Sequence, residues 1–217
     1  NCAPPLRMAR LAADRDRAEL VVFPEQFDWH GGTISQKIAA GEGFQGGPAY
    51  DMCRKLAMDC GIHVHTGSFY EATDDRSRVF NTSVVFNPKG EEIGRYRKIH
   101  LFDITTPDGM RYGESEAVVA GTESVTVDVN GFKLGLAICY DLRFPELFQQ
   151  LMRKGADVML LPAAFTLQTG KDHWEVLCRA RAIETQSYFL AAAMVGQFDH
   201  CGEKRNTYGH SLICDPW

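Results

Sequence analysis

The sequence predicts a single layered α/β domain, a class that some schemes name α+β. Short apolar runs that end at a proline, typical of strands buried on both faces, occur at residues 19–23 and 158–161. Segments of helical periodicity separate such runs, and residues 171–183 form a long one. The length of 217 residues suits one domain with one sizeable core. Helices and buried strands mixed along one chain favour a layered architecture.

The first half of the chain is expected to contain two helices, two separate strands and a hairpin. The second helix stops at Gly61, a residue that commonly ends helices. The turn residues 88–90 separate the two strands of the hairpin. In chain order the expected elements are a helix at 6–18, a strand at 19–23, a helix at 49–60, a strand at 63–70 and a hairpin at 78–87 and 92–99.

The second half begins with a polar, glycine-containing stretch at residues 103–121, which predicts a loop. Asn130-Gly131 between two apolar runs is the strongest hairpin signal in the chain. In chain order the expected elements are a hairpin at 124–129 and 132–139, a helix at 144–154, a strand at 158–161, a helix at 171–183 and a strand at 188–195.

Two segments, residues 18–25 and 156–163, resemble each other. Each follows a predicted helix, begins with alanine and an acidic residue, and continues as an apolar run to a proline. This similarity suggests two related halves packed face to face. Both ends of the chain look interrupted, because no strand precedes the first helix and no closing element follows Trp217.

The composition argues against several classes of protein. The formal net charge of -5 disfavours a nucleic-acid partner, which would select a basic surface. No apolar run approaches the ~18 residues that a membrane span needs, so no membrane partner is expected. Seven cysteines without the spacing of a disulfide framework indicate free thiols in a reducing compartment. We expect a cytoplasmic protein, with a mitochondrial form left open because a targeting segment could precede Asn1.

Three reactive residues each follow a predicted strand. Glu25 follows the run at 19–23, Lys98 lies at the end of the second hairpin strand, and Cys139 ends the apolar run that begins at Phe132. The carboxyl ends of strands are where α/β sheets bind ligands. Residues distant in the sequence are therefore expected to meet at this edge.

Cys139 is the sharpest of the three candidates. Residues 138–147 predict a strand, a tight turn and the start of a helix. Such a turn would aim the thiol outward and place the positive helix end near the sulfur, which lowers the pKa of a thiol. The alternative is a small buried hydrophobic side chain, which is usual for a free cysteine.

The motifs around these residues resemble the nitrilase, or carbon–nitrogen hydrolase, superfamily, whose mark is a Glu-Lys-Cys triad. The matching stretches are residues 23–25, 96–103 and 139–146, in the expected order. The resemblance implies a four-layer αββα sandwich, with residues 1–217 as a single carbon–nitrogen hydrolase domain that lacks the family's first strand and C-terminal tail. It also implies a homodimer or a larger homo-oligomer.

The resemblance implies a role for each member of the triad. Cys139 would attack a small amide with Glu25 as base, and Lys98 would stabilise the oxyanion together with the backbone N–H of Tyr140. Attack would release ammonia and leave a thioester that water hydrolyses. This chemistry needs no metal and no organic cofactor.

The family also has a second glutamate on the loop after the lysine. Glu114 matches this position and would orient the leaving amine or the water, with Glu116 as the competing candidate. By the same analogy, Phe165, Thr166 and His173 would lie near the substrate.

Two C-terminal stretches, residues 164–177 and 179–188, resemble the Nit branch of metabolite-repair amidases within this family. Residues 208–211 and 215–217 look most like the members that act on deaminated glutathione. The alternative is an ω-amidase, which hydrolyses α-ketoglutaramate and α-ketosuccinamate. Sequence similarity alone distinguishes these two kinds of amidase only weakly.

The sequence disfavours three alternatives to an amidase. A papain-like protease would pair Cys139 with His173 or His210, but it would leave Glu25 and Lys98 without a role. A non-catalytic scaffold member of the family is disfavoured because Glu25, Lys98 and Cys139 are all present. A structural zinc site lacks the usual ligand spacing. Its candidate ligands are Cys53, Cys60, His63 and His65.

Overall fold

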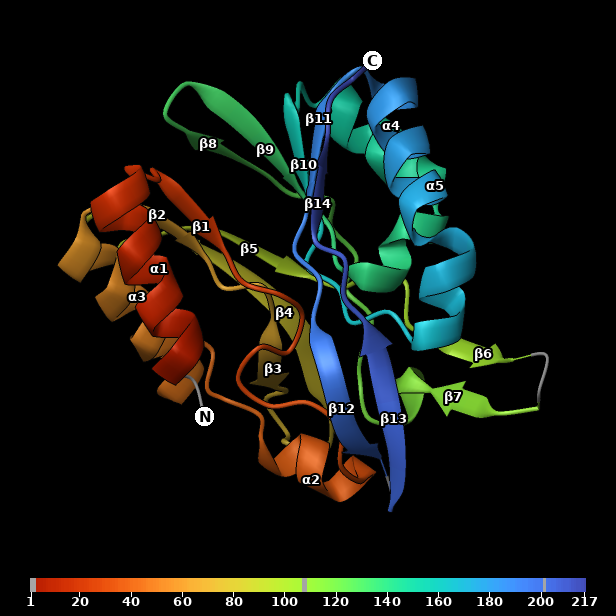
Figure 1. Cartoon of the computed structure of the whole chain (residues 1–217). Coiled ribbons are helices and arrows are strands. Elements are labelled where there is room, and N and C mark those ends of the chain that lie inside the picture. Colours follow the sequence, from red (N-terminus) through yellow and green to blue (C-terminus); the bar gives the residue numbers. More distant parts are fainter. Residues whose placement is uncertain (1–2, 107–108, 201) are drawn as a thin grey trace.

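The computed structural model describes residues 3–106, 109–200 and 202–217. Two β-sheets face each other in the middle of the molecule, and helices cover the outer face of each sheet (Figure 1). The order of layers is therefore helix, sheet, sheet, helix. This arrangement confirms the expected α/β class and the αββα sandwich.

The first sheet lies beneath the N-terminal helices. Its strand order is β1-β2-β4-β3, and β5 also pairs with β4. Only β1 and β2 run parallel, and the other pairs are antiparallel. The strands are β1 (Leu20–Val22), β2 (His63–His65), β3 (Phe69–Ala72), β4 (Val79–Phe86) and β5 (Glu92–Arg97).

The second sheet has the order β14-β11-β10-β9-β8. Its three central strands are parallel, and antiparallel strands flank them on both sides. The strands are β8 (Thr126–Val129), β9 (Phe132–Leu136), β10 (Val158–Leu160), β11 (Tyr188–Ala191) and β14 (Leu212–Cys214).

The helices stabilise the two sheets through two apolar cores. Ala9 of α1 and Leu56 of α3 belong to the core beside the first sheet. Phe148 of α4 and Trp174 of α5 belong to the core beside the second sheet. Figure 1 shows the two helix pairs on opposite sides of the sandwich. The helices are α1 (Ala3–Asp16), α2 (Ile34–Ala39), α3 (Pro48–Cys60), α4 (Pro145–Arg153) and α5 (Leu167–Thr185). None of these described helices is both long and apolar enough to cross a membrane.

Three sequence-based expectations of secondary structure are wrong, and the first two concern residues 63–70 and 103–121. The strand expected at 63–70 is two strands, because Gly67 adopts a φ of +65° and turns the chain between β2 and β3. The loop expected at 103–121 contains the hairpin of β6 (Asp103–Thr105) and β7 (Arg111–Gly113), followed by the 3-10 turn η1 (Glu114–Glu116). The strands of this hairpin are short and mostly polar, so the sequence does not show the apolar–polar alternation that indicates a strand.

Two further elements were missed. The short helix α2 begins at a capping box, in which the Thr33 hydroxyl accepts from the Gln36 N–H and the Gln36 side chain accepts from the Thr33 N–H. The strand expected at 188–195 ends at Ala191, and the chain continues into a separate hairpin of β12 (Val195–His200) and β13 (Glu203–Tyr208). Residues of α2 and β12 line the cavity described below.

Candidate active site

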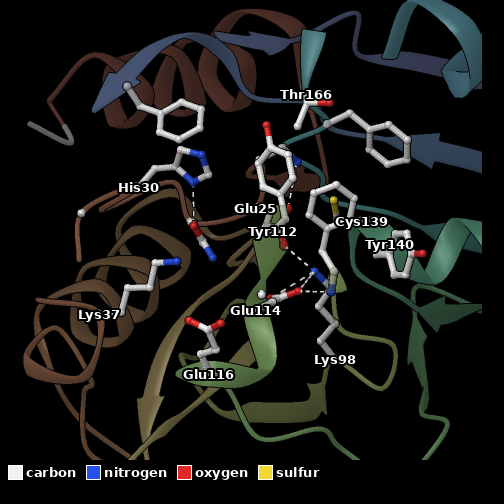
Figure 2. Close-up of a pocket in the computed structure, with 18 of the residues that line it drawn as sticks. Glu25, His30, Lys37, Lys98, Tyr112, Glu114, Glu116, Cys139, Tyr140 and Thr166 are labelled. Atoms are coloured by element: carbon white, nitrogen blue, oxygen red, sulfur yellow. Dashed lines mark hydrogen bonds and ion pairs between the residues drawn. The ribbon is translucent and has the colours of Figure 1, made fainter. Parts of the chain in front are cut away.

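The three sequence-predicted reactive residues come together where the two sheets meet (Figure 2). Glu25 lies three residues beyond β1 and Lys98 follows β5, so the first sheet positions both. Cys139 lies three residues beyond β9 of the second sheet. The site therefore exists only when the two halves of the sandwich are packed together.

A tight contact between two loops holds Glu25 in place. Ser68 donates its N–H to the Pro24 carbonyl at 3.3 Å, and the Gln26 N–H donates to the Ser68 hydroxyl at 3.1 Å. Gly67 packs so closely against Pro24 that a Cβ atom there would overlap the Pro24 carbonyl oxygen. With its φ of +65°, this position favours glycine for both reasons.

Cys139 lies in a strained turn that a buried carboxylate supports. Its φ is +48°, in the left-handed region that is costly for a residue with a side chain. The Asp141 carboxylate accepts from the Ile138 N–H at 2.8 Å and from the Tyr96 hydroxyl at 2.7 Å. It also accepts from the His100 N–H at 3.0 Å. These donors fix the direction of the Cys139 side chain.

The surroundings of Cys139 correct the expectation of an outward-pointing thiol with a lowered pKa. The residue is buried, and the chain continues as a 3-10 turn, η2 (Cys139–Arg143), before α4 begins at Pro145. Burial and the neighbouring Glu25 charge raise the pKa of Cys139 well above its usual 9.0, although Lys98 acts in the opposite direction. The thiol is therefore protonated at neutral pH, so a base is needed to activate it.

Lys98 is buried between two carboxylates. Its Nζ lies 3.1 Å from Glu25 Oε1 and 2.8 Å from Glu114 Oε2. Burial by itself lowers the pKa of Lys98, but the charges of Glu114 and Glu25 outweigh burial and hold the pKa well above 10.5. Lys98 is therefore a fixed cation in this centre and cannot serve as the base.

Glu25 is an ionised hydrogen-bond acceptor. Burial raises the pKa of Glu25. The Lys98 charge and the hydrogen bonds from Cys139, Lys98 and Asn81 lower it, and together they outweigh burial, so the pKa lies below its usual 4.5. The Ala164 N–H donates to Glu25 Oε2 at 2.9 Å. Glu25 thus contacts the Cys139 thiol as a carboxylate, which is the form that can accept a proton.

Sequence reasoning missed Asn81, a buried residue of β4. Its Nδ2 donates to Glu25 Oε1 at 2.9 Å and to Glu114 Oε1 at 3.2 Å, so one amide contacts both carboxylates. The backbone carbonyl of Asn81 also accepts a hydrogen bond from the backbone N–H of Lys98 at 2.9 Å. The sequence assigned Asn81 no role at the site, because asparagine at the start of a predicted strand looks like an ordinary polar residue.

The two glutamates of the η1 turn have different surroundings. Glu114 contacts Lys98 and accepts from the Phe102 N–H at 2.7 Å. Glu116 has a side chain that is 49% exposed and pairs with Arg111 at 3.6 Å. The geometry therefore brings Glu114 to the reactive centre and leaves Glu116 near solvent.

The remaining candidates divide into those that line the cavity and one that does not. Tyr140, Phe165 and Thr166 line a cavity of about 270 Å³ that opens beside Cys139. Within the described part of the chain, the Tyr140 backbone N–H has no protein acceptor. His173 lies outside this cavity, because α5 directs its Nδ1 to Arg143 Nη2 at 3.1 Å. The expectation of substrate contact at His173 does not fit this placement.

The alternatives from the sequence find little support in this geometry. Neither His173 nor His210 lines the cavity with Cys139, so a papain-like pair does not form. In residues 3–106, 109–200 and 202–217, no group of three or more metal-binding side chains is placed to hold a metal ion. Among the described cysteines, Cys60, Cys139, Cys178 and Cys214 are free thiols.

The chain belongs to the carbon–nitrogen hydrolase family, whose model matches residues 5–217. It is similar to the deaminated glutathione amidase of Synechocystis, with 42% identity over 94% of this chain and 75% of that protein. The human deaminated glutathione amidase is 40% identical over 100% of this chain and 65% of its own length. Nit3 of Saccharomyces cerevisiae, a member of branch 10 of the nitrilase superfamily, superposes with a TM-score of 0.82 at 32% identity, covering 97% of this chain and 73% of Nit3.

The family and the expected class of enzyme are thus confirmed. The protein is an amidase, a hydrolase that acts on carbon–nitrogen bonds of small molecules.

Proposed function

We propose that the protein hydrolyses the amide bond of deaminated glutathione through a thioester on Cys139. The main support is the buried contact of a protonated thiol with an ionised carboxylate, Glu25, beside a fixed cation, Lys98. The names of relatives at about 40% identity support the substrate.

In the first step Glu25 accepts the Cys139 proton as the sulfur attacks the amide carbon. A general base of this kind is required because the pKa of Cys139 is raised above neutral pH. The carbonyl oxygen becomes an oxyanion, which the Lys98 ammonium and the Tyr140 N–H stabilise. The absence of a protein acceptor for this N–H within the described residues supports its role.

In the second step the carbon–nitrogen bond breaks and the nitrogen takes up the proton that Glu25 holds. Glu114 orients the departing amine, and afterwards it orients the water that replaces the amine. Glu25 then accepts a proton from this water as it attacks the thioester, which releases the acid and restores the thiol. Atoms balance with water as the only co-substrate, and no metal or organic cofactor takes part.

The proposed substrate changes the expected leaving group. Deaminated glutathione contains a secondary amide between a 2-oxo diacid and the dipeptide cysteinylglycine. Its hydrolysis releases 2-oxoglutarate and the dipeptide amine, so the ammonia expected from the sequence applies only to primary amides. The ω-amide α-ketoglutaramate has the same acyl group but does release ammonia.

The assay compares both substrates with purified protein. We expect 2-oxoglutarate and free cysteinylglycine from deaminated glutathione, at a higher kcat/KM than ammonia release from α-ketoglutaramate. Preference for the second substrate would instead identify an ω-amidase, and no turnover of either would contradict the proposed substrate class. Cys139→Ala should abolish turnover of both, while the matched variant Cys60→Ala, which alters a partly exposed thiol outside the cavity, should retain it.

We further propose a cytoplasmic homodimer or larger homo-oligomer, with a mitochondrial form as the alternative compartment, and with no nucleic-acid or membrane partner. Support for self-association comes from α5, which exposes the apolar side chains Val176 (71%) and Ile183 (45%). Sedimentation of the purified protein would test this, because a monomer at all concentrations contradicts it.

A further inference from the structure

Tyr70 of β3 lines the cavity close to the reactive centre. It lies directly opposite Asn81 of β4 in the antiparallel ladder, and directly opposed side chains lie on the same face of a sheet. The Asn81 amide contacts both Glu25 and Glu114. The buried Tyr70 side chain therefore lies next to these two carboxylates, where the first sheet borders the cavity.

Neighbouring side chains hold the Tyr70 ring and its hydroxyl in place. Gln26 Nε2 donates to Tyr70 Oη at 2.6 Å, and Gln26 Oε1 lies 2.6 Å from His30 Nδ1. The ring of Trp29 packs against the Tyr70 ring in an edge contact, with centroids 6.1 Å apart. The Tyr70 oxygen is thus the acceptor in its bond with Gln26, and its own proton points elsewhere.

The proton of the Tyr70 hydroxyl has no acceptor within the described part of the chain. The opposite Asn81 side-chain oxygen does not accept it either. Burial and the charges of Glu114 and Glu25 raise the pKa of Tyr70 well above 10.0, so the hydroxyl keeps its proton at neutral pH. A buried donor without an acceptor costs free energy, which a ligand in the cavity can recover. Tyr70 is therefore a neutral hydrogen-bond donor for the group that occupies this part of the cavity.

The direction of the leaving group decides which part of the substrate Tyr70 meets. Figure 2 shows Thr166 and Glu114 on opposite sides of the Cys139 sulfur. If Glu114 orients the departing amine, as proposed above, the leaving group lies toward Glu114 and the acyl group lies toward Thr166. Because Tyr70 is next to Glu114, it meets the leaving group.

The charge of the reactive centre indicates which kind of acceptor Tyr70 can bind. Lys98 contacts both Glu25 and Glu114, so these three side chains sum to one negative charge. A substrate carboxylate this close to the centre meets net repulsion, which solvent screens only weakly in a buried site. A carbonyl group carries no net charge, and its oxygen accepts readily from a phenol. The surroundings of Tyr70 thus favour a carbonyl over a carboxylate.

We propose that the Tyr70 hydroxyl donates a hydrogen bond to a carbonyl oxygen of the leaving group, so that the enzyme selects amides whose departing amine is the N-terminus of a peptide. This inference rests on the proposed function, because the role of Glu114 sets the direction of the leaving group. Cysteinylglycine has such a carbonyl on the residue that bears the departing nitrogen. A primary amide such as α-ketoglutaramate has none, and Tyr70 has no part in its hydrolysis.

The test compares Tyr70→Phe with the wild-type enzyme on three substrates. These are deaminated glutathione, an analogue in which CH2–CH2 replaces the peptide bond of the leaving dipeptide, and α-ketoglutaramate. We expect the KM for deaminated glutathione to rise about fivefold in Tyr70→Phe with little change in kcat, as for loss of one neutral hydrogen bond. The KM values for the analogue and for α-ketoglutaramate should stay the same in the variant. Tyr50→Phe is the matched control, because it removes a buried tyrosine hydroxyl that lies outside the cavity and donates to Glu92.

The three substrates separate the possible results. An increase in KM confined to deaminated glutathione supports the inference. An equal increase for the analogue or for α-ketoglutaramate overturns it, as does an unchanged KM for deaminated glutathione or a similar increase in Tyr50→Phe. If the wild type hydrolyses deaminated glutathione but not α-ketoglutaramate, the analogue alone provides the comparison. If the wild type fails to hydrolyse deaminated glutathione, the proposed function fails first, and the inference fails with it.

Discussion

The cavity has a buried floor and an exposed mouth, and the two regions use charge differently. The floor consists of Glu25, Lys98 and Cys139, which are buried, and Glu114, whose side chain is 11% exposed. Each contacts another member. The mouth includes Lys37, Arg111 and Glu116, which are partly or largely exposed. On the floor the protein fixes protonation states through burial and neighbouring charges, whereas solvent screens the charges at the mouth.

This difference indicates a division of labour. Floor residues control the chemical step, because they touch the reacting atoms in a site of low dielectric constant. Mouth residues affect which substrates bind, and their removal changes affinity by modest factors. Substitutions on the floor should therefore act on kcat, and substitutions at the mouth should act on KM.

The largest effect is expected for Glu25→Gln. The amide keeps the shape of the side chain but cannot accept the Cys139 proton, so kcat should fall by about 10³-fold or more. Circular dichroism and thermal unfolding would confirm that the variant is folded, and steady-state kinetics would measure the loss. A decrease of less than tenfold would mean that another group activates the thiol.

A smaller effect separates the two glutamates of η1. Glu114→Gln should lower kcat by about 10²-fold, because the departing amine and the incoming water lose a charged partner. Glu116→Gln, two positions away and exposed, should stay within about twofold of the wild type. Equal losses in the two variants would contradict the contrast between floor and mouth.

Asn81→Ala tests how the floor fixes the protonation state of Glu25. The Asn81 amide lowers the pKa of Glu25, so its removal should raise this pKa and shift the acid limb of kcat/KM upward by about one pH unit. Rates measured between about pH 3 and pH 7 would show the shift. A variant with a reduced rate but an unmoved acid limb would assign Asn81 a purely structural role. In the wild type the acid limb should lie at low pH, since the pKa of Glu25 is below 4.5.

Much of this fold could be predicted from the sequence because its signals are local. Buried parallel strands are short apolar runs, and Asn130-Gly131 forms the turn between β8 and β9. The β6–β7 and β12–β13 hairpins could not be predicted, since their strands lie outside the two main sheets and lack an alternating apolar face. Their positions depend on packing around the cavity.

The candidate site shows the same limit. Motifs identified Glu25, Lys98 and Cys139, because residues of these types after strands are unusual enough to stand out. The raised pKa of Cys139 could not be predicted, because it depends on burial and on Glu25, which is distant in the sequence. Asn81 was missed for the same reason, since its contacts with two carboxylates arise only from the folded arrangement.

The most direct test of the account is to trap the covalent intermediate on Cys139. Enzyme mixed with deaminated glutathione or with α-ketoglutaramate would be quenched in acid within the first turnovers and weighed intact by mass spectrometry. The account predicts that any substrate that is turned over adds the same 2-oxoglutaryl mass, that peptide mapping places it on Cys139, and that Cys139→Ala shows none. Turnover without a thioester on Cys139, or turnover by Cys139→Ala, would contradict the mechanism.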